Sequence, residues 1–317
     1  MLNIRYPVIM APMFLVSNTD MVIAALRSGI TGAIPALNYR NDRDFRAALE
    51  EIRTASDKPF GINLIVNKSN YRMKEQLQTC VDYNVDFIIT SLGNPAPVIN
   101  ACKPNGMKVF CDVTEEKYAR KVTDLGADAL IAVNNIAGGH AGKLPPEKLI
   151  PLLRENSDLP VISAGGVGDG AGLHRMLELG ACGISMGSPF IACQESPVSE
   201  AYKNACIEYG KEDIVMTDRL SGTPCTVINT PYVQETGTRQ TWLESMLNRN
   251  RKLKKYAKML TFYKGMKSLE KAAFEATYKT MWCAGPSIEH VREVRPVADI
   301  VKSLIKEYEN IVQPHAG

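Results

Sequence analysis

The sequence lacks the features of several protein classes. Its eight cysteines form no C-x-x-C pair and its four histidines do not cluster with them, so a metal site is not expected. No apolar run approaches the ~20 residues that cross a bilayer. Pro7 and Pro12 interrupt the apolar N-terminus, which also lacks the basic start of a secretion signal. We therefore expect a cytoplasmic protein with free thiols and no membrane contact.

Excess charge is also small. The net charge of +3 is too low to indicate nucleic acid, and the aromatic residues are not interleaved with a basic stripe. One local run, from Arg249 to Lys258, contains six basic residues and no acid. It fits the phosphate of NADPH or an acidic carrier protein, but such runs more commonly form a solvated helix face, which is the interpretation we favour.

Eight short apolar runs alternate with amphipathic helical stretches, which predicts eight parallel strands joined by helices. Eight such units close into a (β/α)8 TIM barrel. The alternative, an open doubly wound sheet, usually has a glycine-rich turn after its first strand. Here the turn is MFLVSN, without glycine. The predicted strands are Tyr6–Met13, Thr31–Leu37, Phe60–Val66, Asp86–Ser91, Lys108–Val113, Ala129–Val133, Pro160–Ala164 and Gly183–Met186.

An extra section, residues 196–281, follows the last predicted strand. It contains a predicted helix at Val198–Tyr209, an irregular stretch at Asp213–Gly237 and a long basic helical region at Arg239–Tyr263. We expect this mainly helical section to pack on the barrel mouth as a lid. The barrel itself would consist of residues 1–195 and 282–317, with a terminal helix at Pro296–Tyr308 completing the outer ring.

Small residues follow the last two predicted strands. Gly165 and Gly166 come directly after the seventh strand, and Gly187 comes directly after the eighth. Paired glycines allow close approach of the backbone and can point N–H groups at an anion. The loops after strands seven and eight hold phosphate in many barrels of this type. The two glycine turns therefore predict a phosphate site. The neighbouring residues included in this site are Ser163, Ser185, Met186 and Ser188.

A histidine follows the sixth predicted strand. Gly138 and Gly139 precede His140 on a loop that offers it no helix face or apolar core. Imidazole is the side chain best suited to proton transfer near neutral pH, which predicts a catalytic role for His140. The other histidines are not expected in the site: His174, His290 and His315.

Three further strand ends carry candidate residues. Asn63 lies in the third strand, where its amide can bond either to the edge of a heterocycle or to a neighbouring strand. Ala11, Pro12 and Met13 end the first strand and could lie against a flat ring. Asp112, near the end of strand five, is either an acid–base group or the anchor of a loop.

Taken in order, IMAPM, GINL, AGGHAG, ISAGGVGDG and ISMGS resemble the FMN-dependent nitronate monooxygenase family, formerly called 2-nitropropane dioxygenases. The resemblance resumes at TMWCAGPSIEHV. It implies FMN phosphate on Gly165, Gly166 and Met186–Ser188, and the flavin ring against Ala11–Met13 with Asn63 at its polar edge. His140 would face the substrate, a nitronate that O2 oxidises to a carbonyl compound and nitrite.

Two departures from the family pattern bear on the substrate. Ile136 stands where members often have Gln or Glu before AGGH, and Phe14–Ser17 replaces a glycine-rich stretch, so the pocket is more apolar. Relatives with a similar loop include FMN-dependent enoyl-acyl-carrier-protein and quinone reductases, which use NAD(P)H, and an acyl carrier protein is a partner only in that reading. A non-catalytic flavin- or phosphosugar-binding barrel is the third possibility. The oligomeric state stays open, a homo-oligomer included.

Overall fold

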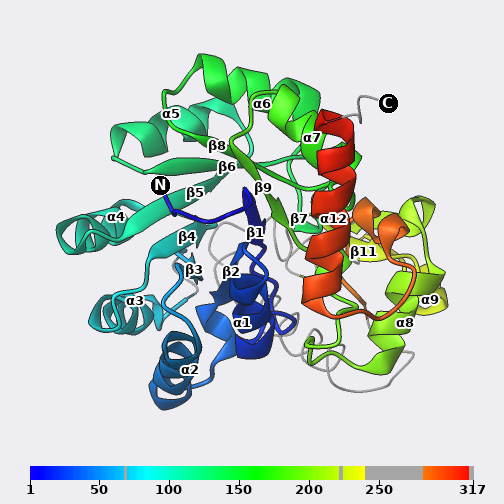
Figure 1. Cartoon of the computed structure of the whole chain (residues 1–317), viewed down its shortest axis with the longest axis horizontal. Helices are drawn as coiled ribbons and strands as arrows, with labels where there is room; N and C mark the ends of the chain where they lie inside the picture. Colours follow the sequence, from blue (N-terminus) through cyan, green and yellow to red (C-terminus); the bar gives the residue numbers. More distant parts are fainter. Residues whose placement is uncertain (68–69, 221–223, 240–280, 314–317) are drawn as a thin grey trace.

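A computed structural model describes residues 1–67, 70–220, 224–239 and 281–313. Its central feature is a closed barrel of eight parallel strands, which confirms the predicted (β/α)8 fold (Figure 1). The first strand pairs with the last, Ile9 lying opposite Ser185. The barrel strands are β1 (Val8–Met10), β2 (Thr31–Pro35), β3 (Gly61–Ile65), β4 (Phe87–Ser91), β5 (Lys108–Val113), β6 (Ala129–Val133), β8 (Val161–Ala164) and β9 (Gly183–Met186).

Helices cover the outside of the barrel. The C-terminal helix α12 (Val297–Val312) packs against α7 and α1 and so completes the ring, as predicted (Figure 1). On α12, Glu307 Oε2 accepts the N–H of Gly170 at 2.9 Å, at the start of α7. The remaining barrel helices are α1 (Thr19–Arg27), α2 (Asp42–Ala55), α3 (Met73–Asp82), α4 (Ala96–Cys102), α5 (Glu116–Asp124), α6 (Pro146–Glu155) and α7 (Gly170–Glu178).

The barrel interior is a small apolar core of its own. Phe87 and Phe110 stack there with ring centroids 5.0 Å apart. Gly61 is required beside them, because a Cβ at this position would lie 2.2 Å from the Phe87 ring. Side chains alternate between the two faces of a strand. Residues two positions beyond these core side chains therefore face the interior again, one layer nearer the mouth.

The prediction of an irregular stretch at Asp213–Gly237 is wrong. This stretch contains β10 (Ile214–Thr217), β11 (Cys225–Ile228) and α9 (Pro231–Thr236), after α8 (Glu200–Glu208). The two strands are only four residues long, and the Thr, Pro and Gly around them obscure their alternation. The long basic region Arg239–Tyr263, with the basic run from Arg249 to Lys258, lies almost entirely outside the described residues.

The antiparallel pair β10–β11 gains a third strand from the barrel. This strand is β7 (Gly139–His140), part of the loop after β6. Cys225 of β11 lies opposite His140. One apolar cluster also joins the section after β9 to the barrel. Within this cluster Tyr202 of α8 stacks on Trp282, with ring centroids 5.6 Å apart. In Figure 1 this section lies beside the barrel, beyond α12.

Candidate functional site

The loop after β6 and the turn after β8 fit tightly together. Gly165 has φ +112°, and a Cβ there would lie 2.5 Å from Asn134 Oδ1 and 2.6 Å from the nitrogen of Ala137. The Asn134 side chain in turn donates to the carbonyl of Gly165 at 3.1 Å. Gly166 has φ +81° and faces the side chain of Ile136. Only glycine fits this turn, whatever the turn binds.

The same turn offers unused hydrogen-bond donors. Among the described residues, no acceptor receives the backbone N–H of Gly165, Gly166, Gly187 or Ser188. Two N–H groups at the start of α7 are already used, since Asp169 caps Gly172 at 2.7 Å and Glu307 accepts from Gly170. Unpaired backbone N–H groups near the surface of two adjacent strand ends fit the oxygens of a phosphate.

The end of β1 lies against the turn after β9. A Cβ on Gly187 would lie 3.4 Å from Met13 Sδ and 3.5 Å from the Cβ of Ala11. Ser17 fixes this strand end, because its hydroxyl accepts the N–H of Met13 and donates to the carbonyl of Ala11. Leu15 follows in the left-handed region, with φ +59° and its N–H bonded to Asn38. The loop is therefore ordered by its own contacts.

Not every predicted residue turns its side chain toward the mouth. The hydroxyl of Ser163 donates to Met176 Sδ on α7 at 3.2 Å, and the side chain of Met186 belongs to the core between barrel and helices. Any contact of these two residues with a ligand would come from the backbone. The hydroxyl of Ser188 accepts the N–H of Gly285 at 2.8 Å, so its oxygen already has one partner.

His140 is brought to the same mouth. Its loop crosses the turn after β9, since a Cβ on Gly138 would lie 2.9 Å from Ser188 Oγ. The loop then returns to the end of β6, where Gly142 donates to the carbonyl of Asn134 at 3.0 Å. The imidazole is accessible to solvent, yet the protein around it excludes enough water to lower the pKa of His140. A neutral imidazole near pH 7 can accept a proton.

A carboxyl group also lies in the mouth. Asp112 Oδ2 accepts the hydroxyl of Ser91 at 2.5 Å, and burial raises the pKa of Asp112 to about 6 although the bond from Ser91 opposes the shift. The partner is a strand residue of the barrel, so Asp112 does not anchor a loop. Ser91 also lies close to Asn63, because the amide nitrogen of Asn63 is 2.7 Å from Ser91 Oγ. Asn63, Ser91 and Asp112 therefore form a row of hydrogen-bonded side chains.

The segment after residue 281 is part of the site, which the sequence analysis did not predict. Gly285 lies against Gly138 and bonds to Ser188. His290 packs on Gly168, with its Nδ1 3.6 Å from Asp169 Oδ2. The signal was present in TMWCAGPSIEHV, which resembles the closing segment of the family. His174 lies outside the site on α7, beside Glu178, and His315 lies outside the described residues.

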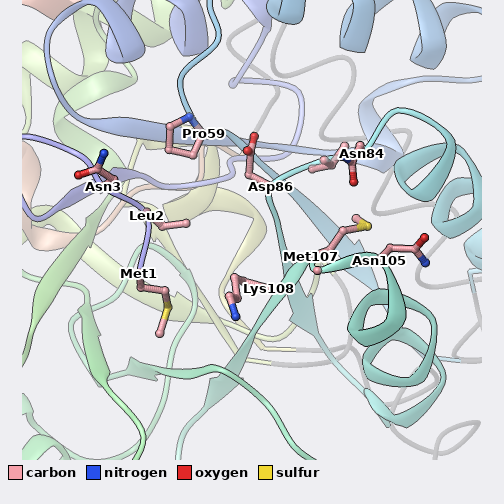
Figure 2. A pocket seen from close by; sticks show the side chains of 11 residues that line it. Met1, Leu2, Asn3, Pro59, Asn84, Asp86, Asn105, Met107 and Lys108 are labelled. Atoms are coloured by element: carbon pink, nitrogen blue, oxygen red, sulfur yellow. The ribbon is translucent and has the colours of Figure 1, made fainter.

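A hollow lies at the opposite end of the barrel. It has a volume of about 340 Å³ and is lined by residues that precede strands, among them Pro59 and Asp86, and by the N-terminal residues (Figure 2). The charged groups there are paired, Asp86 with Arg53 at 2.7 Å and Lys108 with Asp128 at 3.1 Å. In barrels of this type that end serves stability and the carboxyl ends of the strands carry the chemistry.

Two classes of site are not found in the described part of the chain. No group of His, Cys, Asp and Glu side chains there is arranged to hold a metal ion. No helix there is both long and apolar enough to cross a membrane.

Known proteins resemble this chain over most of its length. FabK from Thermotoga maritima has 29% identity and a TM-score of 0.86, with 99% of this chain and 96% of that chain covered. A nitronate monooxygenase from Pseudomonas aeruginosa is 29% identical over 252 residues, 65% of this chain and 71% of the relative. A (3aS,4S,5R,7aS)-5-hydroxy-7a-methyl-1-oxo-octahydro-1H-indene-4-carboxyl-CoA dehydrogenase from Rhodococcus jostii RHA1 is 29% identical over 233 residues, 74% of this chain but only 65% of the relative.

The family model described as nitronate monooxygenase matches residues 68–307, which is more than half of the chain. The matched range includes the His140 loop and the turns at Gly165–Gly166 and Gly187–Ser188. It also includes Gly285, which bonds to Ser188. The fold, the site and this match together place the chain in the nitronate monooxygenase family of oxidoreductases.

Proposed function

We propose that this protein is an FMN-dependent nitronate monooxygenase that oxidises alkyl nitronates with O2 to carbonyl compounds and nitrite. The observation that carries the proposal is that the loop of His140 packs on the turns after β8 and β9, where the backbone N–H groups have no acceptor among the described residues. The relative named nitronate monooxygenase supports the choice of substrate. When bound, the flavin would supply the electron-transfer and oxygen chemistry.

The protein's own residues would bind, orient and exchange a proton. The N–H groups of Gly165, Gly166, Gly187 and Ser188 fit the phosphate. Ala11 and Met13 lie beside Gly187, where the end of β1 would line the path from that phosphate towards the ring. His140, neutral near pH 7, would take the proton from the carbon next to a nitro group, or hold an already ionised nitronate by a hydrogen bond.

The substrate form separates these two roles of His140. With a neutral nitroalkane, we expect His140→Ala to lower kcat/KM about 10²- to 10⁴-fold, because general-base catalysis contributes that much. With the preformed nitronate the loss should be much smaller, since no proton has to be removed. Bound FMN, measured by its visible absorbance, should be retained. Equal losses with both substrates would exclude the role as a base.

A second candidate is an FMN-dependent oxidoreductase acting on a coenzyme A thioester. Relatives from Rhodococcus jostii and Mycobacterium tuberculosis, both 29% identical, carry the name of a carboxyl-CoA dehydrogenase, which favours this class. A parallel assay of nitronates, quinones and enoyl and acyl thioesters, each with and without NADH or NADPH, would discriminate. Rapid anaerobic bleaching of the flavin by NAD(P)H would support the reductase and rule out a function as an oxygenase alone.

A further inference from the structure

Three polar side chains form a hydrogen-bonded row across the barrel mouth. Asn63 lies on β3, Ser91 on β4 and Asp112 on β5, and these three strands are adjacent. Phe87, Ile89 and Phe110 fill the interior below them on β4 and β5. Strand alternation therefore turns Ser91 and Asp112 inward as well, directly above the apolar core. The row forms part of the floor of the candidate site.

The chemistry of the partners fixes the direction of every bond in the row. The carbonyl of Ile89 can only accept, so the atom of Asn63 that lies 3.1 Å from it must be the amide nitrogen. The same nitrogen lies 2.7 Å from Ser91 Oγ, which must therefore accept there. The single hydrogen of the Ser91 hydroxyl is then donated to Asp112, 2.5 Å away.

This direction leaves one acceptor unused. The Asn63 amide nitrogen spends both hydrogens on Ile89 and Ser91, and its Oδ1 accepts no hydrogen bond from any residue in the described ranges. Asn63 is only 7% exposed. The Oδ1 atom is not among the fully buried side-chain atoms that lack a partner, so it keeps access to the mouth, where an N–H group of a ligand can reach it.

Asp112 is not placed there to form an ion pair. Within the part of the chain that the structure describes, no Lys, Arg or His lies within salt-bridge distance of it, although burial disfavours its charge. A carboxylate held in this way is costly to stability. Its one hydrogen-bond partner is Ser91, through which it acts on the amide of Asn63.

We propose that Asp112 is a positioning residue which, through Ser91, locks the Asn63 amide so that Oδ1 accepts the ring N–H of the bound flavin. This inference rests on the function proposed above and deepens it. The pyrimidine edge of a flavin carries one N–H between two carbonyl oxygens. The Ile89 carbonyl already selects this orientation of the amide, and the bond to Ser91, whose only hydrogen goes to Asp112, holds it more firmly, so that Oδ1 stays available to that N–H.

The test compares variants of the row by their affinity for FMN. Ser91→Ala removes the bridge, and we expect the Kd of the apoprotein for FMN to rise about five- to twentyfold. Ser91→Thr keeps the hydroxyl and should stay within about twofold of the wild type. Asp112→Asn should weaken FMN binding in the same direction and make the midpoint potential of the bound flavin more positive, because a negative charge is removed near the ring.

Asp128→Asn is the matched control. Asp128 is a carboxylate at the opposite end of the neighbouring strand pair, where it accepts the N–H of Val109 at 2.9 Å and pairs with Lys108. Its loss should lower thermal stability and leave the FMN affinity and potential unchanged. A loss of FMN affinity equal to that of Ser91→Ala would mean that general destabilisation explains the effect, and the proposal would fail.

A double-mutant cycle provides the decisive comparison. Once Asn63 is replaced by Ala, Ser91→Ala should have no further effect on FMN binding, because the row acts only through that amide. Additive effects would overturn the proposal, as would Ser91→Ala and Asp112→Asn variants that bind FMN like the wild type. In these cases the proposed function survives. A wild-type protein that binds no FMN at all would instead refute both.

Discussion

Gly165 is constrained by backbone strain and by close neighbours at once. Its φ of +112° is unfavourable for any other residue, and fixed groups of Asn134 and Ala137 occupy the space of a Cβ. We expect Gly165→Ala to lower the free energy of unfolding of the apoprotein by about 2–4 kcal/mol. Gly106→Ala isolates the strain, because Gly106 has φ +70° and no atom within 4 Å of a Cβ, and should cost about 1 kcal/mol. Urea denaturation measures both, and equal losses would contradict the packing argument.

Asp112 predicts a specific dependence of stability on pH. Burial raises the pKa of Asp112 from 3.8 to about 6 in the folded protein. The contribution of Asp112 to the free energy of unfolding is therefore most favourable below pH 3.8, and it is lost as the pH rises from there through about 6. Because the carboxyl remains partly accessible, Asp112→Asn should stabilise the protein by about 1–2 kcal/mol above pH 6 and by little near pH 4. Denaturation at several pH values checks this, and a gain independent of pH would point to another cause.

Single residues differed in how far the sequence could predict them. His140 and the glycine turns could be chosen as candidates from their flanking residues, and the structure brings them to the same end of the barrel. The direction of a side chain was not, as Ser163 shows: its hydroxyl faces α7, since neighbouring strand positions alternate between barrel interior and helix layer. The row from Asn63 to Asp112 joins three strands, and no local pattern reveals a bond between residues 28 and 21 positions apart.

At the level of elements, β7 is the least local part of the site. It consists of two residues and exists because β11, more than 80 positions later, pairs with it. The hydroxyl of Thr226 reinforces the pair by donating to the carbonyls of Ala137 and Gly139, at 3.0 and 3.4 Å. No periodicity of two residues is visible in so short a strand, which is why the sequence predicted a plain loop there.

Thr226→Val tests whether β11 positions His140. The substitution keeps the shape and removes the donor, so we expect kcat with a neutral nitroalkane to fall about three- to thirtyfold while the Kd for FMN stays within about twofold. Thr217→Val is the control, because Thr217, on β10 of the same small sheet, donates its hydroxyl to the carbonyl of Thr238 at 2.8 Å and not to the His140 loop. If both variants lose kcat equally, the effect belongs to the sheet as a whole.

On the scale of the whole molecule, the barrel was the most predictable feature. Eight apolar strands must bury both of their faces. A closed barrel surrounded by helices buries them all and connects the strands by right-handed crossovers. The section after β9 was harder to predict, since its described residues pack on the barrel through a shared apolar cluster around Tyr202 and Trp282.

The pairing of β7 with β11 connects the His140 loop to a part of the chain that lies outside the barrel. The N–H groups of the proposed phosphate site belong to barrel turns, whereas His140 lies on a strand whose partner is outside the barrel. A local opening of the small sheet would therefore be expected to move His140, the proposed base, and to leave the turns of the proposed phosphate site in place. In the proposed function, phosphate binding and proton transfer would then depend on different parts of the chain, namely the turns after β8 and β9 and the pair of β7 with β11.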